Sequence, residues 1–364
     1  MKIALLGDMA FYGAYCVNTN NKLLDNLSEV SDYLAGFDCV VGNLETPFSE
    51  AKKTSGAKSA YICADVENVV VLKKLHLSAA LLANNHMFDF GEEGYECTKR
   101  VLDKAGIPYY GTDGLEYLCE KDDNKIAFTG FCCYTSNPLQ MAAKYGHHGV
   151  NCFNVDTVGK LMKQKADDGY LNIVAVHAGL EHVNFPHADH IQAARQLAEI
   201  VPYVYYGHHP HVIQGVEEVK DSLLAYSLGN FCFDDVYTSA STKPLVELTE
   251  NNRTGMILEL EVEQNKIVGW KKTIVHIGKD GHISVLSEVP AALCEYDGAL
   301  ASAVGNDEYA AHRMKIINDR MNERKAQRTL SWYLKRFRPR YVHIILNARK
   351  NAKAYNLNVK QYIK

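Results

Sequence analysis

The sequence predicts an α/β sheet protein with a C-terminal helical extension, and three observations support this class. From residue 1 to about 230, short apolar runs alternate with segments of helical periodicity, as in a sheet covered by helices. The chain is 47% hydrophobic and 23% charged, an ordinary globular composition, and is long enough for one large domain or two smaller ones. After about residue 300 the strand-like runs cease and the sequence becomes helical.

Short apolar runs are the expected strands. They cover residues 2–7, 38–43, 78–84, 125–131, 171–176, 203–207 and 223–230. Segments of helical spacing lie between them, at residues 22–34, 66–76, 93–105, 157–166 and 187–200. This alternation is the basis of the α/β prediction.

The C-terminal third changes character. Residues 255–278 alternate apolar and polar positions around an Asn-Lys turn, which predicts an antiparallel hairpin that closes the domain. Residues 301–350 are typical of helix, interrupted at Pro339. We therefore expect a domain of residues 1–295 followed by a basic helical extension of residues 296–364.

The net charge of −4 combines two regions of opposite sign. Residues 301–364 carry 15 Lys and Arg against 4 Asp and Glu, so the rest of the chain is strongly acidic. Three interpretations of the extension are open: an arm that packs on the acidic body or on a second subunit, contact with an anionic membrane surface, or nucleic-acid binding. Nucleic-acid binding is the least favoured, because no recognised module accompanies the charge.

We expect neither a signal peptide nor a membrane-spanning segment. The apolar run after Lys2 is too short for a signal-peptide core, and no run approaches about 20 uninterrupted apolar residues. A cytoplasmic location follows as the expectation, with peripheral attachment to a membrane as the alternative. The 10 cysteines are scattered without a CxxC pair, which predicts reduced thiols that mostly pack as small apolar side chains.

Polar side chains with ligand chemistry follow the predicted strands. Each alone has an ordinary explanation as a turn former, a helix cap or a solvated group. Open α/β sheets bind their ligands at the carboxyl ends of strands. The placement of all these polar side chains after predicted strands therefore indicates a site. The residues are Asp8, Asn43, Glu45, Asn84, Asn85, His86, His177, Glu181 and the histidines of 207–215. Asp89 either orients a ligand or caps a helix, and His187 and His190 are expected on a helix surface.

The segment GHHPHVIQG (207–215) is the strongest single signal. Gly207 permits a tight turn and Pro210 fixes the backbone between His209 and His211, so both imidazoles can reach neighbouring metals. His208 is then expected to point elsewhere. A mixed set of oxygen and nitrogen donors suits Mn, Fe or Zn better than Ca or Mg, and such ions polarise phosphoryl or acyl oxygens and activate water.

In order along the chain, six motifs resemble the CapA/PgsA family of capsule and poly-γ-glutamate synthesis proteins, within the calcineurin-like metallophosphoesterase superfamily. They are GD (7–8), GNLETP (42–47), NNHMFDFG (84–91), HAGLE (177–181), GHHPHVIQG (207–215) and YSLGNFCFD (226–234). The resemblance runs from residue 1 to about 235. It implies a four-layer α/β/β/α sandwich with the site at the sheet edge.

The resemblance also implies a role for each matching residue. The metal ligands would be Asp8, Glu45, Asn85, His177, His209 and His211, with Glu45 in the bridging position. His86 would lie beside the metals as general acid or phosphoryl contact. The supporting positions would be Asn43, Asp89 and Glu181.

Two departures from the superfamily leave the number of divalent metal ions open, at one or two. The usual Asp-x-His has no histidine here, because Met9 and Ala10 follow Asp8, and Glu45 replaces an Asp.

The implied function is a metal-dependent hydrolase of phosphoesterase type, linked to the synthesis of capsule, poly-γ-glutamate or another envelope polymer. Its substrate would contain phosphate, glutamyl or glycan groups. The alternative is a non-catalytic metal-binding component of a surface-polymer assembly. The missing histidine after Asp8 favours the alternative, whereas His86 next to Asn85 favours chemistry. The loops 132–153 and 232–252 are the expected walls of the site.

Overall fold

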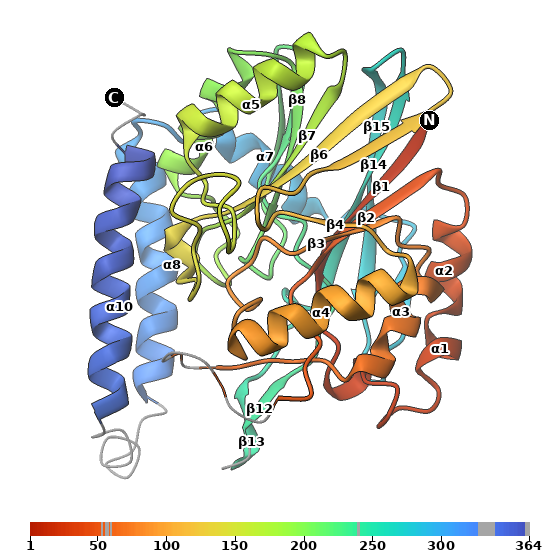
Figure 1. The fold of residues 1–364 in the computed structure, drawn as a ribbon. Helices are drawn as coiled ribbons and strands as arrows, with labels where there is room; N and C mark the ends of the chain where they lie inside the picture. Colours follow the sequence, from red (N-terminus) through yellow and green to blue (C-terminus); the bar gives the residue numbers. More distant parts are fainter. Residues whose placement is uncertain (52–53, 55–57, 59, 239–240, 327–338, 361–364) are drawn as a thin grey trace.

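Two sheets stacked against each other form the centre of the molecule (Figure 1). The computed structural model describes residues 1–51, 54, 58, 60–238, 241–326 and 339–360. The first sheet has eight strands. Its order is β16 (Ile283–Val285), β15 (Lys266–Ile277), β14 (Thr254–Glu263), β1 (Lys2–Met9), β2 (Cys39–Leu44), β3 (Ala79–Leu81) and β4 (Tyr109–Tyr110), with β11 (Asn230–Cys232) also paired to β1.

The second sheet has six strands. Its order is β5 (Tyr117–Lys121), β6 (Asn124–Cys132), β7 (Leu171–His177), β8 (Tyr203–His208), β10 (Ser222–Ala225) and β9 (Val216–Val219). The parallel neighbours β6, β7 and β8 form its middle. They are covered on both faces, which is why they appear in the sequence as nearly continuous apolar runs. A separate small ribbon pairs β12 (Val236–Thr238) with β13 (Ser241–Val246).

Helices cover the outer face of each sheet. The first sheet carries α1 (Leu23–Asn26), α2 (Ser28–Leu34), α3 (Val69–Lys74) and α4 (Gly91–Ala105). The second carries α5 (Val155–Asp167) and α6 (Ala188–Ala198). Short 3-10 turns complete the connections at η1 (Gly13–Tyr15), η2 (Val66–Asn68) and η3 (Tyr134–Ser136). The layer order is therefore α/β/β/α, which confirms the expected sandwich.

Two apolar cores hold these layers together. The larger one lies between the sheets and under α2–α4, and includes Leu5, Val41, Phe128 and Tyr206. The smaller one lies between the second sheet and α5–α6, and includes Val174 and Leu197 among other buried side chains. Each fully buried side chain of this size contributes about 1.5–3 kcal/mol through the hydrophobic effect. The side chains that are polar and yet buried gather elsewhere, at the strand ends.

Most predicted elements are confirmed, with differences in detail. The predicted helix 22–34 is two helices that meet at Leu27, and the run 223–230 divides into β10 and β11, with Gly229 at φ +69° between them. The predicted hairpin is β14–β15, but its turn lies at Gln264 and Asn265, both with positive φ. Because β14 pairs antiparallel with β1, the hairpin extends the first sheet.

The described part of the C-terminal extension is helical. Its elements are α7 (Ala291–Leu300), α8 (Asp307–Ala326), α10 (Pro339–Tyr355) and the one-turn η4 (Asn356–Lys360). Helix α10 is described from Pro339 onward, and the predicted interruption at Pro339 stays a prediction. Residues 327–338 of the predicted helix lie outside the described residues. The boundary at 295/296 falls inside α7 and stays a prediction.

Both α8 and α10 pack on the body of the molecule beside α6 (Figure 1). The Tyr309 hydroxyl donates to the Pro186 carbonyl at 2.7 Å, and the Tyr355 hydroxyl donates to Asp189 Oδ2 at 2.9 Å. These contacts support the packed-arm interpretation for the described residues. None of the helices described here is both long and apolar enough to cross a membrane.

Candidate metal centre

The candidate ligands meet where the carboxyl ends of both sheets come together. Asp8 lies near the end of β1, and Glu45 comes directly after β2. His177 is the last residue of β7, and the turn that carries His209 and His211 follows β8. The sequence predicts one sheet edge; the structure shows two edges facing each other, each supplying part of the site.

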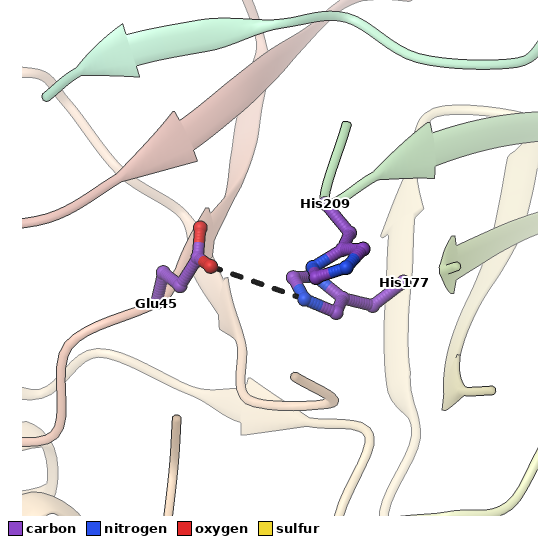
Figure 2. A group of neighbouring side chains, drawn as sticks. All are labelled: Glu45, His177 and His209. Atoms are coloured by element: carbon purple, nitrogen blue, oxygen red, sulfur yellow. Dashed lines mark ion pairs between the residues drawn. The ribbon is translucent and has the colours of Figure 1, made fainter. Parts of the chain in front are cut away.

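One group of donors joins Glu45 to two histidines of the second sheet. Figure 2 shows Glu45, His177 and His209 pointing toward one another. One donor atom from each lies within 4.8 Å of the others, and Glu45 Oε1 is 3.9 Å from His177 Nε2. The same His177 nitrogen is 2.9 Å from Asn85 Oδ1, which places Asn85 with this group.

A second group shares the same carboxylate. Asp8, Glu45 and His211 also offer donor atoms within 4.8 Å of one another. His211 Nδ1 lies 3.3 Å from Asp8 Oδ2, and His211 Nε2 lies 3.6 Å from Glu45 Oε1. Glu45 is thus common to both groups, where the resemblance implied a bridging ligand.

The turn after β8 holds its histidines in an unusual backbone conformation. His209 has φ +93° and His211 has φ +56°, which for residues with a side chain costs on the order of 1–3 kcal/mol each. The His209 amide donates to Asp8 Oδ2 at 3.1 Å, which ties this turn to β1. The strain is retained at the residues that carry the imidazoles, as is typical of functional sites.

His208 does not point away from the site, so that expectation is wrong. Its Nδ1 lies 2.8 Å from Asp8 Oδ1, and the residue is buried. Strand β8 extends through His208, and alternation along a strand places it on the same face as Tyr206, between the sheets. His208 therefore orients the Asp8 carboxylate.

Several donor atoms of the site have no partner within the described part of the chain. Both carboxylate oxygens of Glu45 are buried without a hydrogen bond, and so are His209 Nδ1 and His208 Nε2. Burying such groups unsatisfied is unfavourable by several kcal/mol, and buried charges are normally paired or bound to metals. An unsatisfied carboxylate between imidazoles fits a divalent transition metal.

Burial and mutual charge set the protonation of the group. Burial raises the pKa of Glu45 well above its usual range, against the opposing charge of His211. Burial acts on Asp8 in the same direction, but hydrogen bonds from His208 and His211 hold the Asp8 pKa well below its usual range. Burial tends to lower the pKa of His211, and the Glu45 and Asp8 charges outweigh it and raise that pKa to about 10.

The histidines of the other group respond differently. Burial lowers the pKa of His209 to about 4 and holds that of His177 well below its usual range. Both rings are therefore neutral at pH 7. Neutral imidazole is the form that binds metals.

His86, Asp89 and Lys58 form a cluster beside Asn85. His86 Nδ1 lies 2.6 Å from Asp89 Oδ2, so the Asp89 carboxylate holds one nitrogen of this ring. Lys58 donates to Asp89 Oδ1 at 2.8 Å and to the Asn85 carbonyl at 2.7 Å, and its side chain is only 6% exposed. Burial lowers the pKa of His86, and the Lys58 charge adds to this effect. Lys58 carried no signal in the sequence, because it is one of three lysines in the polar stretch 49–60 and no motif includes it.

The two remaining supporting positions, Asn43 and Glu181, differ in how close they lie to the two donor groups. Asn43 donates to Asp8 Oδ1 at 2.8 Å and lies 3.4 Å from His177 Nδ1, so it supports ligands in both groups. Glu181 lies at the rim with its side chain 44% exposed. Asn230 was not singled out, yet its Oδ1 is 2.9 Å from His211 Nδ1. Its position at the start of β11, inside the YSLGNFCFD motif, was the available signal.

Two helix residues were also placed wrongly. His190 is buried, not exposed, because it lies on the inner face of α6 with Ala193, Ala194 and Leu197. His187 is half-buried and caps α6 by accepting from the Asp189 amide.

The fold and the donor groups at the strand ends together define an α/β/β/α sandwich protein with a candidate metal centre. The family of the bacterial capsule synthesis protein PGA_cap matches residues 2–235, and the chain belongs to this family. The PGA biosynthesis protein CapA of Bacillus subtilis (strain 168) is 29% identical over 247 residues, which are 65% of this chain and 64% of the relative. The capsule biosynthesis protein CapA of Bacillus anthracis is 28% identical over 242 residues, 64% of this chain and 59% of the relative. The matched region thus spans less than two thirds of either relative's length.

Solved structures show more distant likenesses. A novel phosphatase of Mycoplasma pneumoniae has a TM-score of 0.47 and 15% identity, over 76% of this chain and 93% of its own. The 5'-nucleotidase of Candida albicans SC5314 has a TM-score of 0.39 and 11% identity, over 89% of this chain and 58% of its own. The fold assignment stands on the strand order and layers of the chain itself.

Proposed function

We propose that the chain is a metal-dependent hydrolase of phosphoesterase type that acts in the synthesis of capsule, poly-γ-glutamate or a related envelope polymer. The observation that carries this proposal is Glu45, whose buried oxygens lack partners while the carboxylate belongs to two donor groups at once. Family membership supports the link to capsule synthesis. A substrate with phosphate, glutamyl or glycan groups is part of the proposal.

The ligands divide between two ions, of Mn, Fe or Zn. Asp8, Glu45 and His211 would hold one. Glu45, Asn85, His177 and His209 would hold the other. A bound ion would supply Lewis-acid polarisation of a phosphoryl or acyl oxygen.

His86 is the proposed proton donor to the leaving group. Its side chain is 12% exposed, so it reaches the mouth of the site, and Asp89 holds its Nδ1. This leaves Nε2 for a substrate oxygen. The Asp89 carboxylate favours the charged ring, although burial and the Lys58 charge outweigh it and lower the pKa of His86. Lys58 holds that carboxylate by its other oxygen.

The second candidate is a metal-binding component of a polymer-synthesis assembly without catalysis. The observation in its favour is the absence of a histidine at Met9 and Ala10, which leaves the Asp8 group with fewer imidazole donors. The two candidates differ in whether His86 takes part in a reaction.

An activity screen of the full-length chain with Mn²⁺ separates the two candidates. The substrates are p-nitrophenyl phosphate, its bis-ester and a γ-glutamyl peptide. We expect hydrolysis of at least one, with kcat reduced about 100-fold or more in His86→Ala, the range of a lost general acid. His276→Ala, at a half-buried position on β15 outside the donor groups, is the control and should keep wild-type activity. No turnover of any substrate supports the non-catalytic candidate, whereas equal turnover in wild type and His86→Ala rejects the role of His86 as proton donor.

A further inference from the structure

A cavity of about 310 Å³ lies between the body and the C-terminal helices. Its walls come from η3, the loop after β7, the start of α6, α8, α10 and η4. The lining residues that matter for its chemistry are Asn137, His187, His190, Arg313, Tyr355 and Lys360. A cavity of this volume is at the lower end of the range for small-molecule sites.

The described lining residues include cations and no acid. Arg313 and Lys360 supply positive charge, and no Asp or Glu is among the residues described as lining the cavity. The nearest acid on α6, Asp189, is already engaged by the Tyr355 hydroxyl at 2.9 Å and by Lys360 Nζ at 3.5 Å. The cavity therefore favours an anion.

Arg313 is the lining residue whose guanidinium is best suited to bind an anion. It is only 8% exposed, and Nε donates to the Phe185 carbonyl at 3.0 Å. Among the described residues the guanidinium makes no other hydrogen bond and no ion pair. Its two terminal amino groups are not among the enclosed atoms that lack a partner, and Arg313 lines the cavity. A buried guanidinium normally meets a carboxylate or phosphate through both amino groups. The nearby His190 Nε2 is a buried polar atom without a partner.

The cavity adjoins the metal centre. Gly179 and Leu180, which line it, follow the ligand His177 by two and three residues. Pro210 Cγ, between His209 and His211, lies 3.5 Å from the position that a Cβ on Gly179 would take. The cavity therefore lies against two of the loops that carry the candidate metal ligands.

We propose that this cavity is an anion subsite that binds one carboxylate or phosphate group of the substrate through Arg313. The assignment of that ligand as substrate rests on the proposed function, whereas anion binding itself does not. The C-terminal extension then completes the substrate site, because Arg313 belongs to α8 and Tyr355 to α10.

Titration calorimetry on the metal-stripped full-length chain tests the subsite, with inorganic phosphate in one arm and glutarate in the other. We expect binding in at least one arm, and the arm that binds identifies the preferred group. Arg313→Gln should weaken binding about tenfold or more, the effect of losing a charge-assisted hydrogen bond. Ala352→Trp, which fills the cavity from α10 without changing charge, should weaken it comparably.

Arg320→Gln is the matched control. This arginine is also on α8 and donates to a loop carbonyl, that of His182 at 2.9 Å, but it does not line the cavity. The affinity of the Arg320→Gln variant for phosphate or glutarate should stay within about twofold of wild type. Absence of binding in both arms, or wild-type affinity in both Arg313→Gln and Ala352→Trp, overturns the subsite. Anion binding that depends on Arg313 in a chain without hydrolase activity would instead keep the subsite and reject the proposed function.

Discussion

His211 Nε2 lies 3.6 Å from Glu45 Oε1, and neither oxygen of that carboxylate has a hydrogen-bond partner within the described residues. Since Glu45 belongs to both donor groups, Glu45→Gln should remove most of the stabilisation by Mn²⁺. At a Mn²⁺ concentration of 100 times Kd, wild type should gain about 2.7 kcal/mol of unfolding free energy and the variant almost none. Thermal unfolding with and without Mn²⁺ measures this. Glu288→Gln, at an exposed position, should respond like wild type; an equal response in Glu45→Gln would place the metal elsewhere.

Lys58 should contribute more to the free energy of unfolding than a lysine in a surface loop usually does. Lys58→Met leaves the fully buried Asp89 with one fewer partner, and breaking a buried ion pair costs roughly 3 kcal/mol. Urea unfolding of the metal-free protein measures the loss. The control is Lys121→Met, whose partner is the partly exposed Asp38 and which should cost much less, because solvent screens this pair. Equal losses in the two variants would show that the Lys58 pair contributes no more than a surface pair.

Gly207 fixes how closely β8 approaches the next strand. A Cβ here would overlap the Tyr226 carbonyl, so Gly207→Ala must shift β8 together with the histidines that follow it. We expect a loss of about 1–3 kcal/mol in stability and weaker Mn²⁺ binding. Gly298→Ala, on α7 with no atom near the added methyl, should be neutral or stabilising by about 0.5–1 kcal/mol. Unchanged metal affinity in Gly207→Ala would contradict this dependence.

The strands of the sandwich were predictable where burial on both faces gives a continuous apolar run, as in β1 and β7. The pattern of apolar runs did not show which strands join which sheet, because pairing partners leave no local pattern; the two-sheet sandwich came only from the family resemblance. The short or half-exposed strands β4, β5 and β9 were also not predicted, because runs of two to five residues are too short to give a clear strand pattern. The division of the predicted helix 22–34 into α1 and α2 at Leu27 was also not predicted, because it depends on tertiary packing.

The meeting of candidate ligands was predictable where they lie at or near the ends of strong strands, as for Asp8 in β1 and His177 in β7. His208 was misjudged, because counting along the turn ignores that β8 continues through it and keeps its alternation. His190 was misjudged because one polar residue on a helix is normally exposed, although its spacing to Ala193 and Ala194 matched the buried face. Lys58 reaches Asp89 only through the fold, and no spacing rule connects residues 31 positions apart.

His190 makes stability depend on pH below neutrality. Burial lowers its pKa to about 3 from an ordinary value of 6.5, so between these values the unfolded chain binds a proton that the folded chain does not. The resulting stability is present above pH 6.5 and is lost as pH falls, at roughly 1.4 kcal/mol per pH unit. Between pH 7 and pH 5, wild type should lose roughly 2 kcal/mol more than His190→Gln in urea unfolding. Parallel losses in the two proteins would rule out this contribution.

The metal content of the full-length chain, reconstituted with Mn²⁺ and dialysed, tests the central claim most directly. The two donor groups predict two ions in wild type. Asp8→Ala and His209→Ala, which alter different groups, should each retain about one, and Glu45→Ala should retain almost none. Less than one ion in wild type, or wild-type content in both Asp8→Ala and His209→Ala, would contradict a metal centre built around Glu45.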